Sequence, residues 1–477
     1  MTTIKNLRKQ LDAKKISSVE LTREFLDKIN NHTELGAFNT VCEEQALSLA
    51  KQADEKIANG EFSALLGVPM AIKDNICTKD IKTTCSSKML EDYAPPYNAT
   101  VMDKLNAQGI VILGKTSMDE FAMGGSSQTS ALAKPKNPFD TERVPGGSSG
   151  GSAVAVSAGL CAAALGSDTG GSIRQPAAFC GITGMKPTYG TVSRFGLVAF
   201  GSSLDQIGPM ARSAEDCGII LNAIAGQDTH DRTTRKHNID FCELLGKSIS
   251  GMKIGIPKEF FGDGIDEEIK TAVINAAKFY EEKGAELVEV SMPTLKYAVS
   301  AYYLLACAEA SSNLSRFDGV KYGHRTSSPQ SYDELIKKSR SEGFGTEVKR
   351  RILLGTYALS SGYYEAYYKK ALAVRQQCRL EHDEIFKKCD VMLTPTTPTV
   401  AYKCGENIDD PVKMYLADIC TVTANIAGIP AISVPCGTDK DGMPIGFSLY
   451  AKRFDDAKLI QFADMYEQEH THPIANL

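Results

Sequence analysis

The sequence predicts an α/β fold, organised as a single large domain with a central mixed β-sheet flanked by helices. Strand-like and helical patterns alternate along the chain, which is typical of this class. The clearest case is the apolar run MKIGIP at Met252, followed by the amphipathic stretch Glu267–Lys283 and the apolar run AELVEVSMP at Ala285. The chain has 477 residues, 43% of them hydrophobic, and no repeat or linker-like stretch, so one domain is expected over residues 1–477.

Helices are predicted for residues 1–60, ahead of a core at about 65–215. Ser17 and Glu20 have the spacing of a capping box, and Leu21, Phe25 and Ile29 then fall on one helical face. Short apolar runs at 65–72 and 109–113 predict the first strands of the core.

A stretch rich in Gly and Ser follows at 124–190. Within it, the small residues of 152–165 predict a tightly packed helix, and residues 167–172 predict a turn that opens another helix. Beyond a polar excursion, the region 299–380 is predicted to be largely helical. The runs VMLTPTTP at Val391 and PAISVPCG at Pro430 are strand-like.

Composition excludes several classes of protein. The net charge of −5 gives no basic surface for nucleic acid, so any RNA contact is expected to be local or made by a partner. The thirteen cysteines include no CxxC pair, which argues against a zinc ribbon and a disulfide framework and favours the cytoplasm. The charged N-terminus is unlike a signal peptide, and the uncharged stretch 144–167 is too rich in Gly, Ser and Ala to span a membrane.

The segment GIVILGKT at 109–116 satisfies the Walker A pattern of nucleotide-binding loops. Such a loop must expose successive backbone N–H groups to phosphate, whereas the four variable positions here are Ile, Val, Ile and Leu. These residue types favour a buried strand. The segment is therefore interpreted as a strand followed by a turn.

The segment GGSSGG at 146–151 contains the hydrolase pattern GxSxG twice, centred on Ser148 and Ser149. An α/β-hydrolase needs an apolar strand before this turn and a histidine for the triad. The preceding residues DTERVPGG form a loop instead, and His470 and His472 lie in a polar tail. This interpretation is therefore disfavoured.

A third set of residues, Lys73, Ser148 and Ser172, suits acyl transfer without histidine. Each residue alone is more often a solvated lysine or a helix-capping serine. Together they provide a nucleophile, a hydroxyl that can relay a proton, and a base. Lysine is a base only when neutral, and the apolar run before Lys73 could lower its pKa by desolvation. Thr169, Gly170 and Gly171 could turn backbone N–H groups inward as an oxyanion hole.

The segments GGSSGGSAVAV and SDTGGSIRQPAAFCGITGMKPT resemble the amidase signature family. The resemblance implies the fold of that family and a Ser–cisSer–Lys triad. In it, Ser172 would be the nucleophile, Ser148 the bridging serine at a cis peptide bond, and Lys73 the general base. The resemblance also places Gln128 near the site, and Thr191 stands where it would have led us to expect arginine.

Three further segments resemble the glutamine-hydrolysing subunits of tRNA-dependent amidotransferases within this family: EASSNLSRFDGVKYGHR at Glu309, EVKRRILLGTYALSSGYY at Glu347 and MYLADICTVTANIAGIPAISVPCG at Met414. Glutamine carries an α-carboxylate and an α-ammonium, so its site needs one cation and one anion, and arginine suits a carboxylate. The resemblance implies that Arg351 binds the carboxylate, Asp418 binds the ammonium and Tyr302 lines the pocket. Arg350 is the alternative candidate to Arg351 for binding the carboxylate. The region at about 240–477 would select the substrate and face the partner subunits.

The resemblance also implies how the chain would work in a complex. The chain would hydrolyse L-glutamine with no metal or cofactor of its own and pass ammonia to a tRNA-binding kinase/amidotransferase subunit. That second subunit would use ATP and Mg to activate glutamate on tRNA(Gln), or aspartate on tRNA(Asn), while a small third subunit wraps around the chain. The alternatives are a stand-alone amidase of simple or aryl amides and a scaffold subunit without catalysis.

Overall fold

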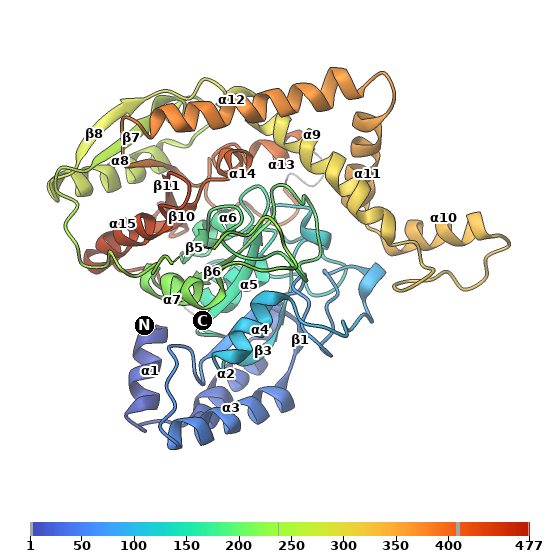
Figure 1. The fold of residues 1–477 in the computed structure, drawn as a ribbon, viewed down its shortest axis with the longest axis horizontal. Coiled ribbons are helices and arrows are strands. Elements are labelled where there is room, and N and C mark those ends of the chain that lie inside the picture. The colour runs from blue at the N-terminus through green and yellow to red at the C-terminus, as the bar shows by residue number, and fades with distance from the viewer. Residues whose placement is uncertain (1–2, 237, 407–410, 476) are drawn as a thin grey trace.

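The computed structural model describes residues 3–236, 238–406, 411–475 and 477, which contain one mixed sheet of eleven strands (Figure 1). The strands lie in the order β1-β3-β2-β4-β6-β5-β10-β11-β9-β7-β8. β2 is parallel to β3 and β4, β7 is parallel to β8 and β9, and the remaining pairs are antiparallel. This architecture confirms the predicted α/β class with a mixed central sheet. The strand bounds are β1 Phe38–Val41, β2 Pro69–Lys73, β3 Val111–Thr116, β4 Ala163–Asp168, β5 Thr183–Lys186, β6 Gln206–Ala211, β7 Lys253–Pro257, β8 Glu286–Val290, β9 Val391–Pro395, β10 Ala431–Thr438 and β11 Pro444–Ala451.

Helices lie before the first strand, between strands along the chain, and against the faces of the sheet. Their bounds are α1 Ile4–Asp12, α2 Ser18–Asn31, α3 Glu43–Ala58, α4 Thr100–Ala107, α5 Gly150–Ser157, α6 Arg174–Phe179, α7 Ala214–Ile224, α8 Glu267–Glu282, α9 Leu295–Asn313, α10 Tyr332–Gly343, α11 Thr346–Leu359, α12 Lys369–Ile385, α13 Pro411–Leu416, α14 Val422–Ala427 and α15 Asp456–Glu469. None of these described helices combines the length and the apolarity that a membrane crossing requires.

The strand β11 is covered on both faces, so all eight of its residues are buried. A side chain at Gly446 would clash with Ala178 of α6. The next residue, Phe447, makes ring contacts with Tyr280 of α8 and Tyr466 of α15. Because successive side chains of a strand point to opposite faces, α6 covers one face here and α8 and α15 cover the other. Figure 1 shows α6 and α15 on either side of these strands.

The predicted N-terminal helix has the capping box that the sequence indicated. The Ser17 hydroxyl accepts from the Glu20 N–H, and the Glu20 carboxylate accepts from the Ser17 N–H at 2.9 Å. Leu21, Phe25 and Ile29 are buried against the core. The start and the buried face of α2 are therefore confirmed.

The predicted helix over 152–165 is wrong in its second half. α5 ends at Ser157, Gly159 adopts φ +66°, and the chain re-enters the sheet as β4 between β2 and β6. Small residues pack equally well in a helix and in a central strand, and their run has no period that distinguishes the two. The backbone therefore turns where the sequence showed continuity.

The Walker-like segment forms the strand β3, as its apolar residues predicted, but the predicted turn is wrong because Gly114, Lys115 and Thr116 continue the strand. Lys115 is fully buried, and its Nζ donates to the Ile76 carbonyl at 2.7 Å and to the Thr83 hydroxyl at 2.8 Å. The Asp74 carboxylate lies 3.8 Å away. This lysine therefore anchors the loop that follows β2.

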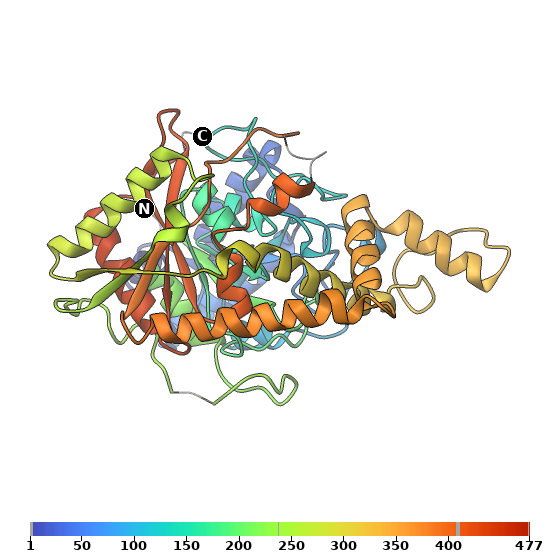
Figure 2. The same cartoon turned by 90° about the horizontal axis from the view of Figure 1, so that it is seen from above.

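Helices α9, α11 and α12 form a further layer, with α9 in contact with both of the others and with α14. This confirms the largely helical character predicted for 299–380. α10 extends away from the body of the molecule in both views (Figures 1 and 2). Within this layer, α9 carries Tyr302 and α11 carries Arg351.

Candidate active site

The sheet brings two separate segments to one edge. β2 and β4 are parallel neighbours, with Ile72 opposite Leu165, so their carboxyl ends lie side by side. β2 ends at Lys73 and β4 ends at Asp168. This edge is where the polar residues of the candidate site converge.

Lys73 is fully buried among serine oxygens. Its Nζ lies 2.8 Å from the Ser148 hydroxyl, 2.8 Å from the Ser149 hydroxyl and 3.2 Å from the Ser167 carbonyl. Burial lowers the pKa of Lys73 from 10.5 to about 7, against the opposing effect of nearby carboxylates, chiefly Asp119. A substantial fraction of this lysine is therefore neutral near pH 7, which a general base requires.

Ser148 is held by the turn that precedes α5, and the Gly147–Ser148 peptide bond is cis. The Gly147 N–H donates to the Gln175 amide oxygen at 2.9 Å, and the Ser148 carbonyl accepts from the Asp119 N–H at 3.2 Å. The Asp119 carboxylate accepts from the Ser127 N–H at 2.9 Å. These contacts fix the serine loop against the segment 119–127, and the sequence had not singled out Asp119.

Ser172 lies next to this loop. Its carbonyl accepts from the Ser149 N–H at 3.1 Å, which ties the two serine segments together. Its side chain has no hydrogen-bond partner among the described residues, and the residue keeps 7% of its surface exposed. The hydroxyl is therefore available for a substrate.

The three predicted oxyanion residues differ in how their N–H groups are used. The Gly171 N–H donates to the Asp168 carboxylate at 2.9 Å, so it is already occupied. Within the described part of the chain, the N–H groups of Thr169, Gly170 and Ser172 have no partner. Gly171 is therefore not a free donor, contrary to the prediction, whereas Ser172, which was not predicted for this role, has a free N–H group. Gly171 itself adopts φ +135°, which a residue with a side chain rarely does.

A buried ion pair between Arg174 and Asp168 stabilises the loop 168–174. The Arg174 guanidinium contacts the Asp168 carboxylate at 3.0 Å, and the Asn425 amide donates to the same carboxylate at 2.8 Å. Burial alone would raise the pKa of Asp168, but the charge and hydrogen bonds of Arg174, together with Lys186 and the Asn425 amide, outweigh burial and lower the pKa to about 2. The carboxylate therefore stays charged and holds the loop 168–174 rigid.

Arg351 and Arg350 are clearly distinguished by burial. The Arg351 side chain is 3% exposed and that of Arg350 is 36% exposed, although both contact Glu347. Only Nε of Arg351 bonds to Glu347, at 2.8 Å, and its two Nη atoms have no hydrogen-bond partner among the described residues. Arg351 therefore presents a free fork of donors inside the protein, which suits a carboxylate.

Aromatic rings enclose the Arg351 guanidinium. The centroids of Phe200, Tyr303 and Tyr415 lie 5.5, 5.1 and 5.5 Å from its Cζ. The Tyr303 hydroxyl donates to the Asp418 carboxylate at 2.7 Å. Burial raises the pKa of Asp418 to about 6. Arg351 and Asp418 are thus linked through one tyrosine.

This pair adjoins the serine cluster. A Cβ on Gly170 would clash with the Tyr302 ring, so Tyr302 packs directly on the oxyanion segment. A Cβ on Gly125, in the loop that follows Asp119, would lie 3.9 Å from Asp418 Oδ1. The structure therefore brings Arg351, Asp418 and Tyr302 to the same region as the serine–lysine cluster.

Gln128 occupies a different position from these residues. Its amide oxygen accepts from the Gly405 N–H at 3.4 Å. Among the described residues, no hydrogen bond joins its side chain to the triad, to Arg351 or to Asp418. Its proximity to the substrate stays a prediction.

Sequence reasoning missed several functional neighbours, above all Ser149 as a contact of Lys73, Asp119, Glu347 and the aromatic enclosure. Ser149 directly follows Ser148, and Tyr303 directly follows Tyr302. Adjacency to a predicted site residue was therefore the sequence signal that could have found them. Phe200 and Tyr415 gave none, because only the tertiary fold brings them to Arg351.

Two residues weighed for the hydrolase pattern lie elsewhere. His470 stacks on Tyr466 with ring centroids 4.0 Å apart, and the His472 ring lies 3.1 Å from Glu467.

All thirteen cysteines lie within the described residues, and none of them forms a disulfide there. Within the same residues, no group of three His, Cys, Asp or Glu side chains is placed to hold a metal ion.

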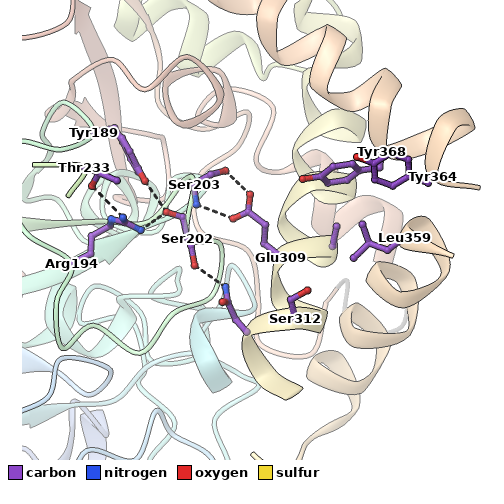
Figure 3. Close-up of a pocket in the computed structure, with 12 residues that line it drawn as sticks. Tyr189, Arg194, Ser202, Ser203, Thr233, Glu309, Ser312, Leu359, Tyr364 and Tyr368 are labelled. Atoms are coloured by element: carbon purple, nitrogen blue, oxygen red, sulfur yellow. Dashed lines mark hydrogen bonds between the residues drawn. The ribbon is translucent and has the colours of Figure 1, made fainter. Parts of the chain in front are cut away.

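A cavity of about 620 Å³ opens between the loop 189–203 and the helices α9 and α11 (Figure 3). The Glu309 carboxylate accepts from the Ser203 N–H at 2.8 Å and from the Ser203 hydroxyl at 2.5 Å. Arg194 lines the side of the cavity formed by the loop, beside Tyr189 and Ser202 (Figure 3). None of the described triad residues, Arg351 or Asp418 lines this cavity, so its volume is no guide to the substrate of the site.

Known proteins share this architecture over almost the whole chain. The family model described as Amidase matches residues 20–460. The chain is 54% identical to the glutamyl-tRNA(Gln) amidotransferase subunit designated A of Thermoanaerobacter pseudethanolicus, over 98% of this chain and 96% of the relative. It superposes with a TM-score of 0.81 on the crystal structure of the protein with the same name from Thermotoga maritima, at 41% identity, covering 96% and 95% of the two chains. The native peptide amidase of Stenotrophomonas maltophilia matches with a TM-score of 0.83 at 27% identity, covering 100% and 99%.

Proposed function

The chain belongs to the amidase signature family, and we propose that it is the glutaminase subunit of a glutamyl-tRNA(Gln) amidotransferase. One observation carries the choice of substrate. A buried guanidinium with free Nη atoms and a buried carboxylate, Arg351 and Asp418, adjoin the serine–lysine cluster. A free amino acid with a side-chain amide presents the two complementary charges.

Acylation uses the three triad residues. The Ser172 hydroxyl attacks the side-chain amide carbon of glutamine, and its proton passes to the Ser148 hydroxyl while the proton of Ser148 passes to neutral Lys73. Nζ of Lys73 and the Ser148 hydroxyl are already 2.8 Å apart. The free N–H groups of Thr169, Gly170 and Ser172 stabilise the oxyanion. The C–N bond then breaks, and the leaving nitrogen takes the proton back from Lys73 through Ser148, so ammonia departs.

Deacylation repeats the proton transfer with water. Lys73, again neutral, removes a proton from the attacking water through Ser148, and the ester bond to Ser172 breaks. The proton returns to the Ser172 oxygen, and glutamate leaves. Throughout both steps, Arg351 holds the α-carboxylate, Asp418 holds the α-ammonium and Tyr302 lines the pocket between them.

The partners follow from the same proposal. A tRNA-binding kinase/amidotransferase subunit would use ATP and Mg to activate glutamate on tRNA(Gln), or aspartate on tRNA(Asn), and a small third subunit would complete the complex. Ammonia released at the Ser172 site would attack the phosphate-activated side-chain carboxyl group of the tRNA-bound amino acid, forming its amide and releasing phosphate. The close similarity over 98% of the chain to proteins named as amidotransferase subunits supports this assembly.

The test is ammonia release from L-glutamine by the chain co-purified with its two partner subunits, with Ser172→Ala as the matched variant. We expect release that is lost in the variant. Release of ammonia from simple amides without any release from glutamine would instead identify a stand-alone amidase. Full amidation of Glu-tRNA(Gln) by the Ser172→Ala complex with glutamine as donor would identify a scaffold role.

A further inference from the structure

The turn that carries Asp418 is joined to the oxyanion segment by one hydroxyl. Thr421 is fully buried, and its Oγ1 donates to the Gly170 carbonyl at 2.6 Å. The same Oγ1 lies 3.1 Å from the Asp418 carbonyl. The Asp418 carbonyl also accepts from the Thr421 N–H at 3.0 Å. Asp418 and Thr421 therefore form one compact turn at the start of α14.

The peptide group between Gly170 and Gly171 is held at both ends. Its carbonyl accepts from Thr421, and its N–H donates to the Asp168 carboxylate at 2.9 Å. The free N–H groups of Gly170 and Ser172 lie on the two sides of this peptide group. Its orientation therefore determines where the N–H groups that would bind the oxyanion point.

The two chain segments are packed without space between them. A Cβ on Gly171 would clash with the Thr421 side chain, so only glycine permits this approach. The Arg174 guanidinium donates to the Thr421 carbonyl at 3.0 Å and to the Asn425 side chain at 2.7 Å. A displacement of the 418–421 turn is therefore transmitted to the loop 168–174.

We infer that Thr421 is a positioning residue that couples binding of the substrate's α-ammonium at Asp418 to the alignment of the oxyanion N–H groups. An ammonium at Asp418 adds a charge partner beside the Tyr303 hydroxyl, which now lies 2.7 Å from the carboxylate, and so fixes the turn. Thr421 passes this restraint to the Gly170 carbonyl. Amides without an α-ammonium are then hydrolysed more slowly once bound, in addition to binding more weakly.

This inference rests on glutamine being the substrate, and it predicts a specific split of kinetic constants. In the wild-type complex, kcat for glutaramate, which is glutamine without its α-amino group, is expected to be at least tenfold lower than kcat for glutamine. Thr421→Val keeps the shape of the side chain but removes the hydroxyl. Its kcat for glutamine is expected to fall about tenfold, because the Gly170 carbonyl loses the hydrogen-bond donor that orients the oxyanion N–H groups.

The decisive quantity is the ratio of the two kcat values. In Thr421→Val it is expected to fall toward one, because ammonium binding no longer reaches the oxyanion segment. Thr421→Ser retains the hydroxyl and is expected to restore the wild-type ratio. Equal loss of kcat for both amides in Thr421→Val, with the ratio unchanged, would show a merely structural residue and overturn the inference.

Two further outcomes separate this inference from the proposed function. A wild-type ratio near one, with glutamine hydrolysed, would overturn the coupling and leave the glutaminase assignment intact. A wild-type complex that hydrolyses simple amides and not glutamine would overturn the assignment itself. If Thr421→Val does not fold, as judged by circular dichroism, Thr421→Ala removes the same hydroxyl and serves as the second variant.

Discussion

The neutral state of Lys73 has a measurable consequence for stability as well as for activity. The residue is fully buried, and burial lowers its pKa from 10.5 to about 7. At pH 7.5 about three-quarters of the side chain is therefore neutral, compared with about one part in a thousand for an unperturbed lysine. Replacing Lys73 by Met keeps a long side chain and removes the titrating group.

The folded and unfolded chains bind different numbers of protons at Lys73 over part of the pH range. Between pH 7 and pH 10.5 the unfolded chain holds a proton on Lys73 and the folded chain has released it, so raising the pH stabilises the fold. The buried amine costs about 4 kcal/mol of folding free energy at pH 7 and about 2 kcal/mol at pH 9. The unfolding free energy of wild type relative to Lys73→Met is expected to rise by about 2 kcal/mol over this interval.

Urea unfolding followed by circular dichroism at pH 7, 8 and 9 measures this difference directly. The wild-type kcat/KM for glutamine, measured in parallel, is expected to rise with pH through about 7 and then level off, because the base must be neutral. A difference in unfolding free energy that does not change with pH would refute the burial argument, as would an activity limb near pH 10.

Substitutions of other residues in the site and the fold are expected to have distinct effects. Arg351→Gln is expected to lower kcat/KM for glutamine by roughly 10²- to 10³-fold through loss of charged hydrogen bonds. Arg350→Gln, at its half-buried neighbour, should change kcat/KM little. Steady-state kinetics that reverse this order would contradict the assignment of Arg351 to the carboxylate. Ser148→Ala is expected to lower kcat by roughly 10²- to 10⁴-fold with little change in KM, because the proton relay between Ser172 and Lys73 is lost. An unchanged kcat in rapid-quench assays would exclude Ser148 as the relay. Lys115→Met is expected to reduce the unfolding free energy by about 3–5 kcal/mol, because it leaves Asp74 buried without its cation. If ATP stabilised the wild-type chain in thermal melts but did not stabilise this variant, the segment would instead be a nucleotide site.

The catalytic half of the site was accessible to sequence reasoning because its chemistry is concentrated in short segments. The serines stand in Gly-rich turns, and Lys73 ends an apolar run that becomes β2. The structure then brings Lys73 Nζ to 2.8 Å from the Ser148 hydroxyl.

The glutamine-binding half was accessible only in part, because it is assembled from distant segments. No local pattern separates Arg351 from Arg350, since both lie on one helix and both contact Glu347. Burial separates them, and that burial comes from aromatic rings on three other segments. Likewise, the alanine-rich residues after Gly159 show no period, so the sheet position of β4 depends on its neighbours β2 and β6.

In the proposed mechanism, Ser172 carries the glutamyl group during hydrolysis. The most direct measurement is mass spectrometry of peptides from the complex, quenched in acid during turnover of L-glutamine. We predict a γ-glutamyl ester on the peptide that contains Ser172, present in wild type and absent from Ser172→Ala. Turnover of glutamine with the glutamyl group on another residue would contradict the role of Ser172 as the nucleophile.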